Sequence, residues 1–164
     1  MIRARKLSNV HKKRSIRPLY SHHQATPYAA FLDTTAVGTT VIYPGMVATQ
    51  SGATEKMKIC NATLKPFGLF ANFVNGDMDE LGDGTEIGVW RGGPDATFEV
   101  LKDALAAVSW TGISTYDTPL FSDANGLITN VDGTGPRVAT LIEAPSNNKI
   151  ILVLDLGGPT AVQS

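Results

Sequence analysis

Short apolar runs and clusters of turn-forming residues alternate along most of this chain. The sequence contains 16 glycines and 9 prolines, and the runs between them are rich in Val, Ile, Thr and aromatic residues. Runs of this kind, bounded by turn residues, predict β-strands. The predicted strands cover residues 39–43, 45–50, 56–63, 67–74, 85–90, 96–101, 119–123, 126–130, 137–144 and 149–156.

The connections between these strands carry residues that favour tight turns. Asn147 and Asn148, in the APSNNK segment, are suited to a hairpin loop because asparagine tolerates positive φ. The other turn segments are NGD (75–77), GDG (82–84), RGGPD (91–95), ANG (124–126) and DGTGP (132–136). Many short strands at near-regular spacing predict an all-β fold, with an antiparallel barrel or sandwich as its architecture.

One stretch, EVLKDALAAVSW over residues 99–110, has helical spacing. Leu101, Leu105 and Val108 recur at intervals of four and three residues. The stretch lacks a clear capping residue, so a strand followed by one or two turns is the alternative.

Charge divides the chain into two parts. The formal net charge is -1, yet half of the 14 Lys and Arg residues lie in the first 17 positions, and Asp33 is the first carboxylate. From Asp33 onward, 7 basic residues face all 15 acidic ones, a net charge of -8. We therefore expect an extended basic N-terminal arm over residues 1–32 and a single β-barrel body over residues 33–164.

A search for catalytic chemistry gives no candidate. The body contains no histidine, since His11, His22 and His23 all lie in the leader. That removes the usual general base and the commonest metal ligand from the part expected to be rigid. A lone cysteine, Cys60, excludes an intrachain disulfide framework and predicts a small buried thiol. We expect no enzyme activity, no cofactor and no metal site.

The acidic segment VNGDMDELGDGTE deserves a separate interpretation. It holds Asp77, Asp79, Glu80, Asp83 and Glu86. Alternating aspartates before a glycine are typical of calcium loops, but the spacing lacks the distal glutamate of an EF-hand. A solvated acidic loop is the preferred interpretation, and a weak calcium site stays open.

The leader has three competing interpretations: a nucleic-acid-binding tail, a segment that docks on an acidic protein surface, and a solvated tail. Apolar residues, including Ile16, Leu19, Tyr20 and Tyr28, are interspersed with its cations, as in a segment that docks against protein. We therefore favour protein docking. The residues expected to bind are Arg3, Arg5, Lys6, Lys12, Lys13, Arg14, Arg17, Leu19 and Tyr20. No apolar run reaches the length of a membrane-spanning helix, so no membrane partner is expected.

The segment PFGLFANFVNGDMDELGDGTEIGVWRGGPDATFEVL (66–101) resembles head decoration, or cement, proteins of tailed bacteriophages. YPGMVA (43–48), LFSDANGLIT (120–129) and the ending VATLIEAPSNNKIILVLDL carry the same likeness. It covers roughly residues 35–156 and leaves the first 30 residues outside.

The resemblance implies a compact β-barrel or β-tulip body without catalytic residues. It also implies a protein that binds the outer surface of the mature capsid, contacts the major capsid protein, forms a homotrimer and reinforces the shell. The leader would be the part that orders on the shell.

Two alternatives remain at this stage. One is a coat protein whose basic arm contacts packaged nucleic acid. The other is a β-barrel hydrolase or sugar-binding domain that uses the segment from Asp77 to Glu86.

Overall fold

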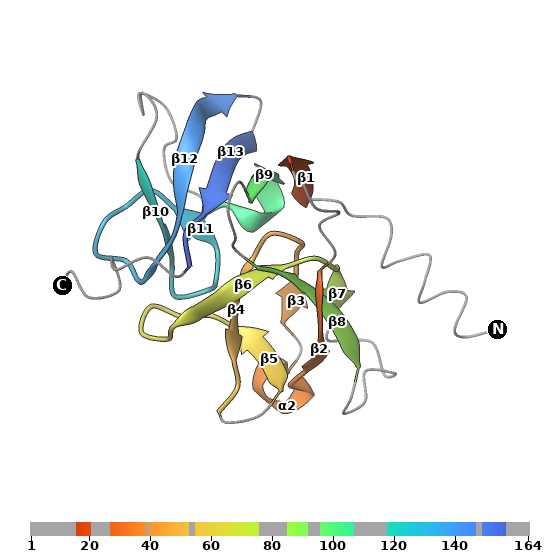
Figure 1. The fold of residues 1–164 in the computed structure, drawn as a ribbon. Coiled ribbons are helices and arrows are strands. Elements are labelled where there is room, and N and C mark those ends of the chain that lie inside the picture. Colours follow the sequence, from red (N-terminus) through yellow and green to blue (C-terminus); the bar gives the residue numbers. More distant parts are fainter. Residues whose placement is uncertain are drawn as a thin grey trace.

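The computed structural model describes residues 16–20, 27–38, 40–52, 55–75, 85–91, 96–106, 118–146 and 149–156. Within these ranges the chain is almost entirely β-structure, which confirms the predicted all-β class. Figure 1 shows two main layers, a small barrel and a larger sheet that lies against one end of it.

Five strands close into the barrel, in the order β2-β5-β4-β6-β8. Neighbouring strands are antiparallel, except for β2 and β5, which run parallel and close the barrel. The barrel strands are β2 (Tyr28–Leu32), β4 (Val47–Gln50), β5 (Lys56–Ile59), β6 (Pro66–Phe70) and β8 (Glu86–Trp90). Closure leaves the barrel without free strand edges, and its small interior is filled by side chains.

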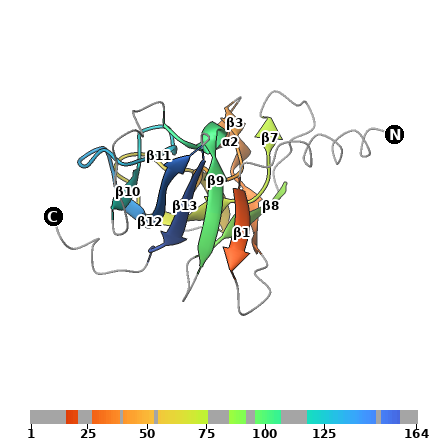
Figure 2. The same cartoon turned by 90° about the horizontal axis from the view of Figure 1, so that it is seen from above.

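The second layer is a six-stranded sheet in the order β1-β9-β13-β12-β10-β11, antiparallel throughout. Its strands are β1 (Ile16–Tyr20), β9 (Thr97–Leu101), β10 (Pro119–Ser122), β11 (Ile128–Thr129), β12 (Arg137–Ser146) and β13 (Lys149–Leu154). Figure 2 shows β1, β9, β13 and β12 side by side, with β1 at one margin of the sheet.

The remaining described elements are short. They are α2 (Thr34–Val37), β3 (Val41–Ile42), β7 (Val74–Asn75) and the 3-10 turn η1 (Lys102–Ala104), with β3 and β7 paired to each other. Asp33 caps α2, because its carboxylate accepts a hydrogen bond from the amide of Ala36 at 3.0 Å. Gly38 ends the helix at φ +56°, a conformation that favours glycine.

A single hydrophobic core spans both layers. Phe70, Leu69 and Val89 fill it from the barrel, and the six-stranded sheet contributes alternate residues such as Leu152 and Val100, all fully buried. Along β13 the alternation is complete, with half-buried residues on the outer face and buried residues on the inner face.

Each predicted strand segment overlaps an observed strand. The first part of the 99–110 stretch is a strand followed by a 3-10 turn, and residues 107–110 lie outside the described ranges. Gly126, in the predicted ANG turn, has φ +75° and donates its amide to the carbonyl of Asp123. The elements β1, β2 and α2 were not predicted from the sequence pattern. Two segments assigned to the arm, 16–20 and 28–32, are therefore strands that pair with the body. The predicted division into an arm (1–32) and a body (33–164) stays a prediction.

Candidate functional site

The leader is joined to the body through β1. This strand pairs antiparallel with β9, so that Ile16 lies opposite Val100, Arg17 opposite Glu99, and Tyr20 opposite Thr97. β1 is an edge strand of the six-stranded sheet. Pro18 fits only such a marginal position, because proline has no amide hydrogen to donate to a further strand.

Burial along β1 shows which side chain faces the core. Ile16 is buried, while Arg17 and Pro18 are exposed and Leu19 is half-buried. Burial of an isoleucine side chain stabilises the docked strand by roughly 1.5–3 kcal/mol. The buried side chain of Ile16 thus holds β1 on the body, while the side chain of Arg17 stays exposed.

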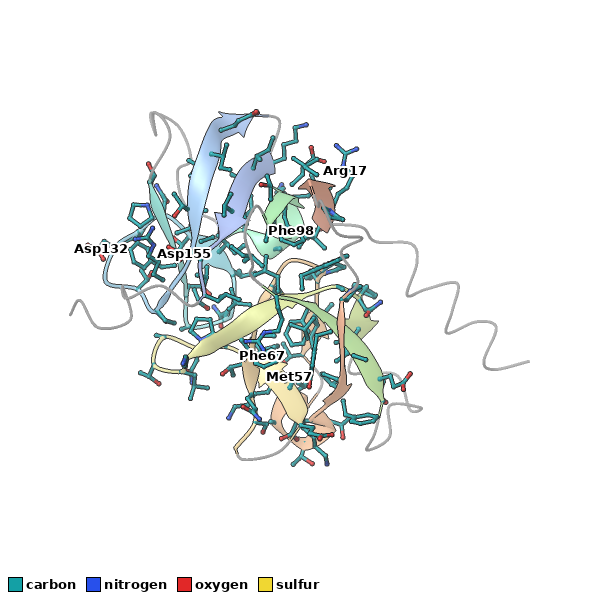
Figure 3. All side chains as sticks on the ribbon, viewed as in Figure 1. Arg17, Met57, Phe67, Phe98, Asp132 and Asp155 are labelled. Atoms are coloured by element: carbon teal, nitrogen blue, oxygen red, sulfur yellow. The ribbon has the colours of Figure 1, made fainter. Side chains whose placement is uncertain are left out.

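A three-residue ionic cluster lies across β1, β9 and β13. Glu99 Oε2 accepts hydrogen bonds from Arg17 Nη2 at 3.3 Å and from Lys149 Nζ at 3.0 Å. The Glu99 side chain is 13% exposed, against 67% for Arg17 and 37% for Lys149. Figure 3 shows Arg17 at the margin of the sheet, and Phe98, which lies opposite Pro18 on β9, nearer the barrel. Two cations therefore share one carboxylate, so the three-residue cluster carries one more positive than negative charge.

The cluster stabilises the ionised form of Glu99. The hydrogen bond from Lys149, assisted by the charge of Arg17, lowers the pKa of this carboxyl below its ordinary value, and partial burial opposes the shift only in part. At neutral pH Glu99 is therefore fully charged and connects the leader strand to β13.

The predicted binding residues divide into two groups. Arg17, Leu19 and Tyr20 are brought together on β1, where the backbone of Tyr20 pairs opposite Thr97. The remaining cations lie outside the described residues: Arg3, Arg5, Lys6, Lys12, Lys13 and Arg14.

Sequence reasoning missed Glu99 and Lys149 as partners of the leader. Glu99 is 82 residues from Arg17 and 50 from Lys149. The sequence did offer one signal: Glu99 is the only charged residue in the apolar strand segment ATFEVL (96–101). A carboxylate that is partly buried in a sheet needs a cationic neighbour. That signal does not say which cation supplies the contact.

The described residues contain no group of three or more His, Cys, Asp or Glu side chains that could hold a metal ion. The acidic residues Asp77 to Asp83 and all three histidines lie outside these ranges, whereas Glu86 begins β8. Burial raises the pKa of Cys60 to about 11, so its thiol stays protonated and unreactive at neutral pH.

Among the helices of the described part of the chain, none is long and apolar enough to cross a membrane.

Comparison with known families gives one match. A family model described as phage cement protein matches residues 1–163, which includes the basic leader that the resemblance had left outside. No curated protein and no solved structure matches the chain. The matched family comprises structural proteins associated with the phage capsid, and such proteins are in general not enzymes.

Proposed function

Because the chain belongs to the phage cement protein family, we propose that it binds the outer surface of a mature phage capsid and stabilises the shell. The observation that supports this proposal is the basic leader, whose strand β1 is paired to the body at the margin of the six-stranded sheet. Because β1 is fixed on the body, the residues before it can contact only the part of the partner surface that lies within the length of the arm. Attachment of this kind requires no catalysis.

The proposed anchor consists of the leader cations Arg3, Arg5, Lys6, Lys12, Lys13, Arg14 and Arg17, with Leu19 and Tyr20. Many weak contacts made by one arm act together, because the first contact raises the effective concentration of the rest. Their cationic character suits an acidic surface of the major capsid protein. Contacts between exposed charges are screened by salt, so attachment should weaken as ionic strength rises.

We further propose that the protein acts as a homotrimer. Three arms on one particle multiply the effective concentration at the shell, and the affinity then exceeds that of a single arm by orders of magnitude. A trimer also matches three-fold positions of an icosahedral lattice, where a bridging protein opposes separation of neighbouring capsomers.

The structure indicates which deletion tests the anchor. A variant that starts at Asp33 would lose β1 and β2, and β2 is part of the closed barrel. A variant lacking residues 1–15 keeps both strands and removes six of the seven leader cations. The full-length protein and this variant should be sedimented with undecorated mature shells across a salt series.

We expect the full-length protein to co-sediment with shells and the shortened variant to bind at least about 10-fold more weakly. Thermal stability of the two proteins should be similar. The same series with duplex DNA serves as the second arm of the experiment. DNA binding without shell binding would contradict the proposal and place the leader in contact with the genome, as in a coat protein.

A further inference from the structure

An aromatic and cationic cluster lies on the surface of the barrel. The guanidinium carbon of Arg91 lies 3.9 Å from the centroid of the Phe67 ring. Tyr28 meets the same ring edge-on, with centroids 5.5 Å apart and planes at 64°. We call these three residues the Arg91 cluster.

The topology explains why residues so distant in sequence meet. In the closed barrel β8 lies between β2 and β6, with Tyr28 opposite Val89 and Trp90 opposite Leu69. Arg91 follows β8 directly, so it emerges between the beginnings of the two flanking strands. Phe67, labelled in Figure 3, sits on β6 and supports the guanidinium from one face.

The cluster is exposed, and its polar groups have no partner among the described residues. Tyr28 is 47% exposed, and Arg91 is exposed as well. Considering only the described ranges, Arg91 forms no ion pair and the Tyr28 hydroxyl no hydrogen bond. The guanidinium carbon thus lies over an aromatic ring, and within the described residues no acidic side chain pairs with its N–H groups.

We propose that the Arg91 cluster binds a carboxylate side chain on a capsid protein surface, as a second contact beside the leader. A guanidinium presents its donors in a planar fork that matches a carboxylate bidentately, and stacking on Phe67 reduces the conformational entropy lost on binding. Tyr and Arg are also the residue types that dominate the energetics of protein interfaces. This inference rests on the proposed function.

Charge argues for a protein carboxylate over a nucleic-acid phosphate backbone. From Asp33 onward the chain has a net charge of -8, which repels a nucleic acid, charged at every phosphate, more strongly than a protein surface whose carboxylates are separated by neutral side chains. The cluster has one guanidinium beside two aromatic rings. It is therefore complementary to a partner surface that presents one carboxylate beside an apolar side chain. One face of Phe67 is covered by Arg91, so that face is not available for base stacking.

The test uses the full-length protein, undecorated mature shells and three substitutions. Arg91→Ala should lower shell affinity by roughly 10- to 30-fold, as expected for an interface hot spot. Arg91→Lys keeps the charge and loses the planar fork, so it should restore only part of the affinity. Lys102→Ala is the matched control, because it removes one exposed cation elsewhere on the body and should change affinity less than about 2-fold.

Each outcome has a distinct meaning. Arg91→Ala binding as tightly as the unaltered protein overturns this inference and leaves the proposed function intact. If Arg91→Lys binds as tightly as the unaltered protein, positive charge alone accounts for the contact, and the inference of bidentate carboxylate binding is also overturned. An Arg91-dependent self-association, measured by sedimentation without shells, would assign the cluster to a second copy of this chain instead. If the unaltered protein does not bind shells, the proposed function fails and this inference fails with it.

Discussion

Replacing Glu99 by glutamine tests whether the ionic cluster holds the leader strand on the body. The side chain keeps its size, but the charge shared by Arg17 and Lys149 is lost. An exposed ion pair contributes roughly 0.2–1 kcal/mol. Glu99 itself is only 13% exposed, whereas Arg17 is 67% exposed, so the pair with Lys149 should be the stronger one. We expect a total loss of about 1 kcal/mol.

Two measurements report this loss. The melting temperature should fall by about 2–4 °C at pH 7, which is the shift expected per kcal/mol for a chain of this size. Amide hydrogen exchange in β1 should accelerate by about 5-fold, because β1 is the element that the cluster holds. Glu143→Gln is the matched control, since it removes an exposed charge of the same sign from β12.

The pH dependence of the effect follows from the lowered pKa of Glu99. A group whose pKa is lower in the folded state contributes stability above its unfolded pKa, about 4.3, and loses it as pH falls through the folded value. The difference between the unaltered protein and Glu99→Gln should therefore be complete at pH 7 and shrink as pH falls below the unfolded pKa and Glu99 becomes protonated. A difference that persists at low pH, or unchanged exchange in β1, would refute the role of the ionised carboxylate.

Two further predictions concern the barrel and the thiol. Gly68→Ala should destabilise the protein by roughly 1–3 kcal/mol, because a Cβ at this position would lie 2.2 Å from the carbonyl oxygen of Trp90 and force β6 away from β8; a melting temperature unchanged within about 1 °C would show that the strands separate easily. Cys60 should resist a thiol-specific reagent at pH 8 in the folded protein and react fully in denaturant, because the thiol is buried and its pKa is raised to about 11. Rapid labelling of the native protein would contradict that burial.

The strands of the body were predictable because their signal is local. Alternation of apolar and polar residues, interrupted by glycine, proline and asparagine, requires no knowledge of partners. The same signal is weak in IRPLY and YAAFL, which became β1 and β2. Proline and basic residues obscure the first, and alanines reduce the apolar contrast of the second. Both segments are strands because β9 and β8 offer them a backbone to pair with.

The sequence by itself determined the all-β class, the turns at 124–126 and 132–136, and the charge difference between the cationic leader and the rest of the chain, since these depend on composition and on neighbouring residues; the other predicted turns lie wholly or largely outside the described residues. Only the tertiary structure decided that Arg17 meets Glu99 and Lys149, and that Arg91 lies on Phe67 beside Tyr28. These contacts depend on strand order and register in a closed barrel and a six-stranded sheet. Strand order results from packing a single core across the whole chain, and no short stretch of sequence contains that information.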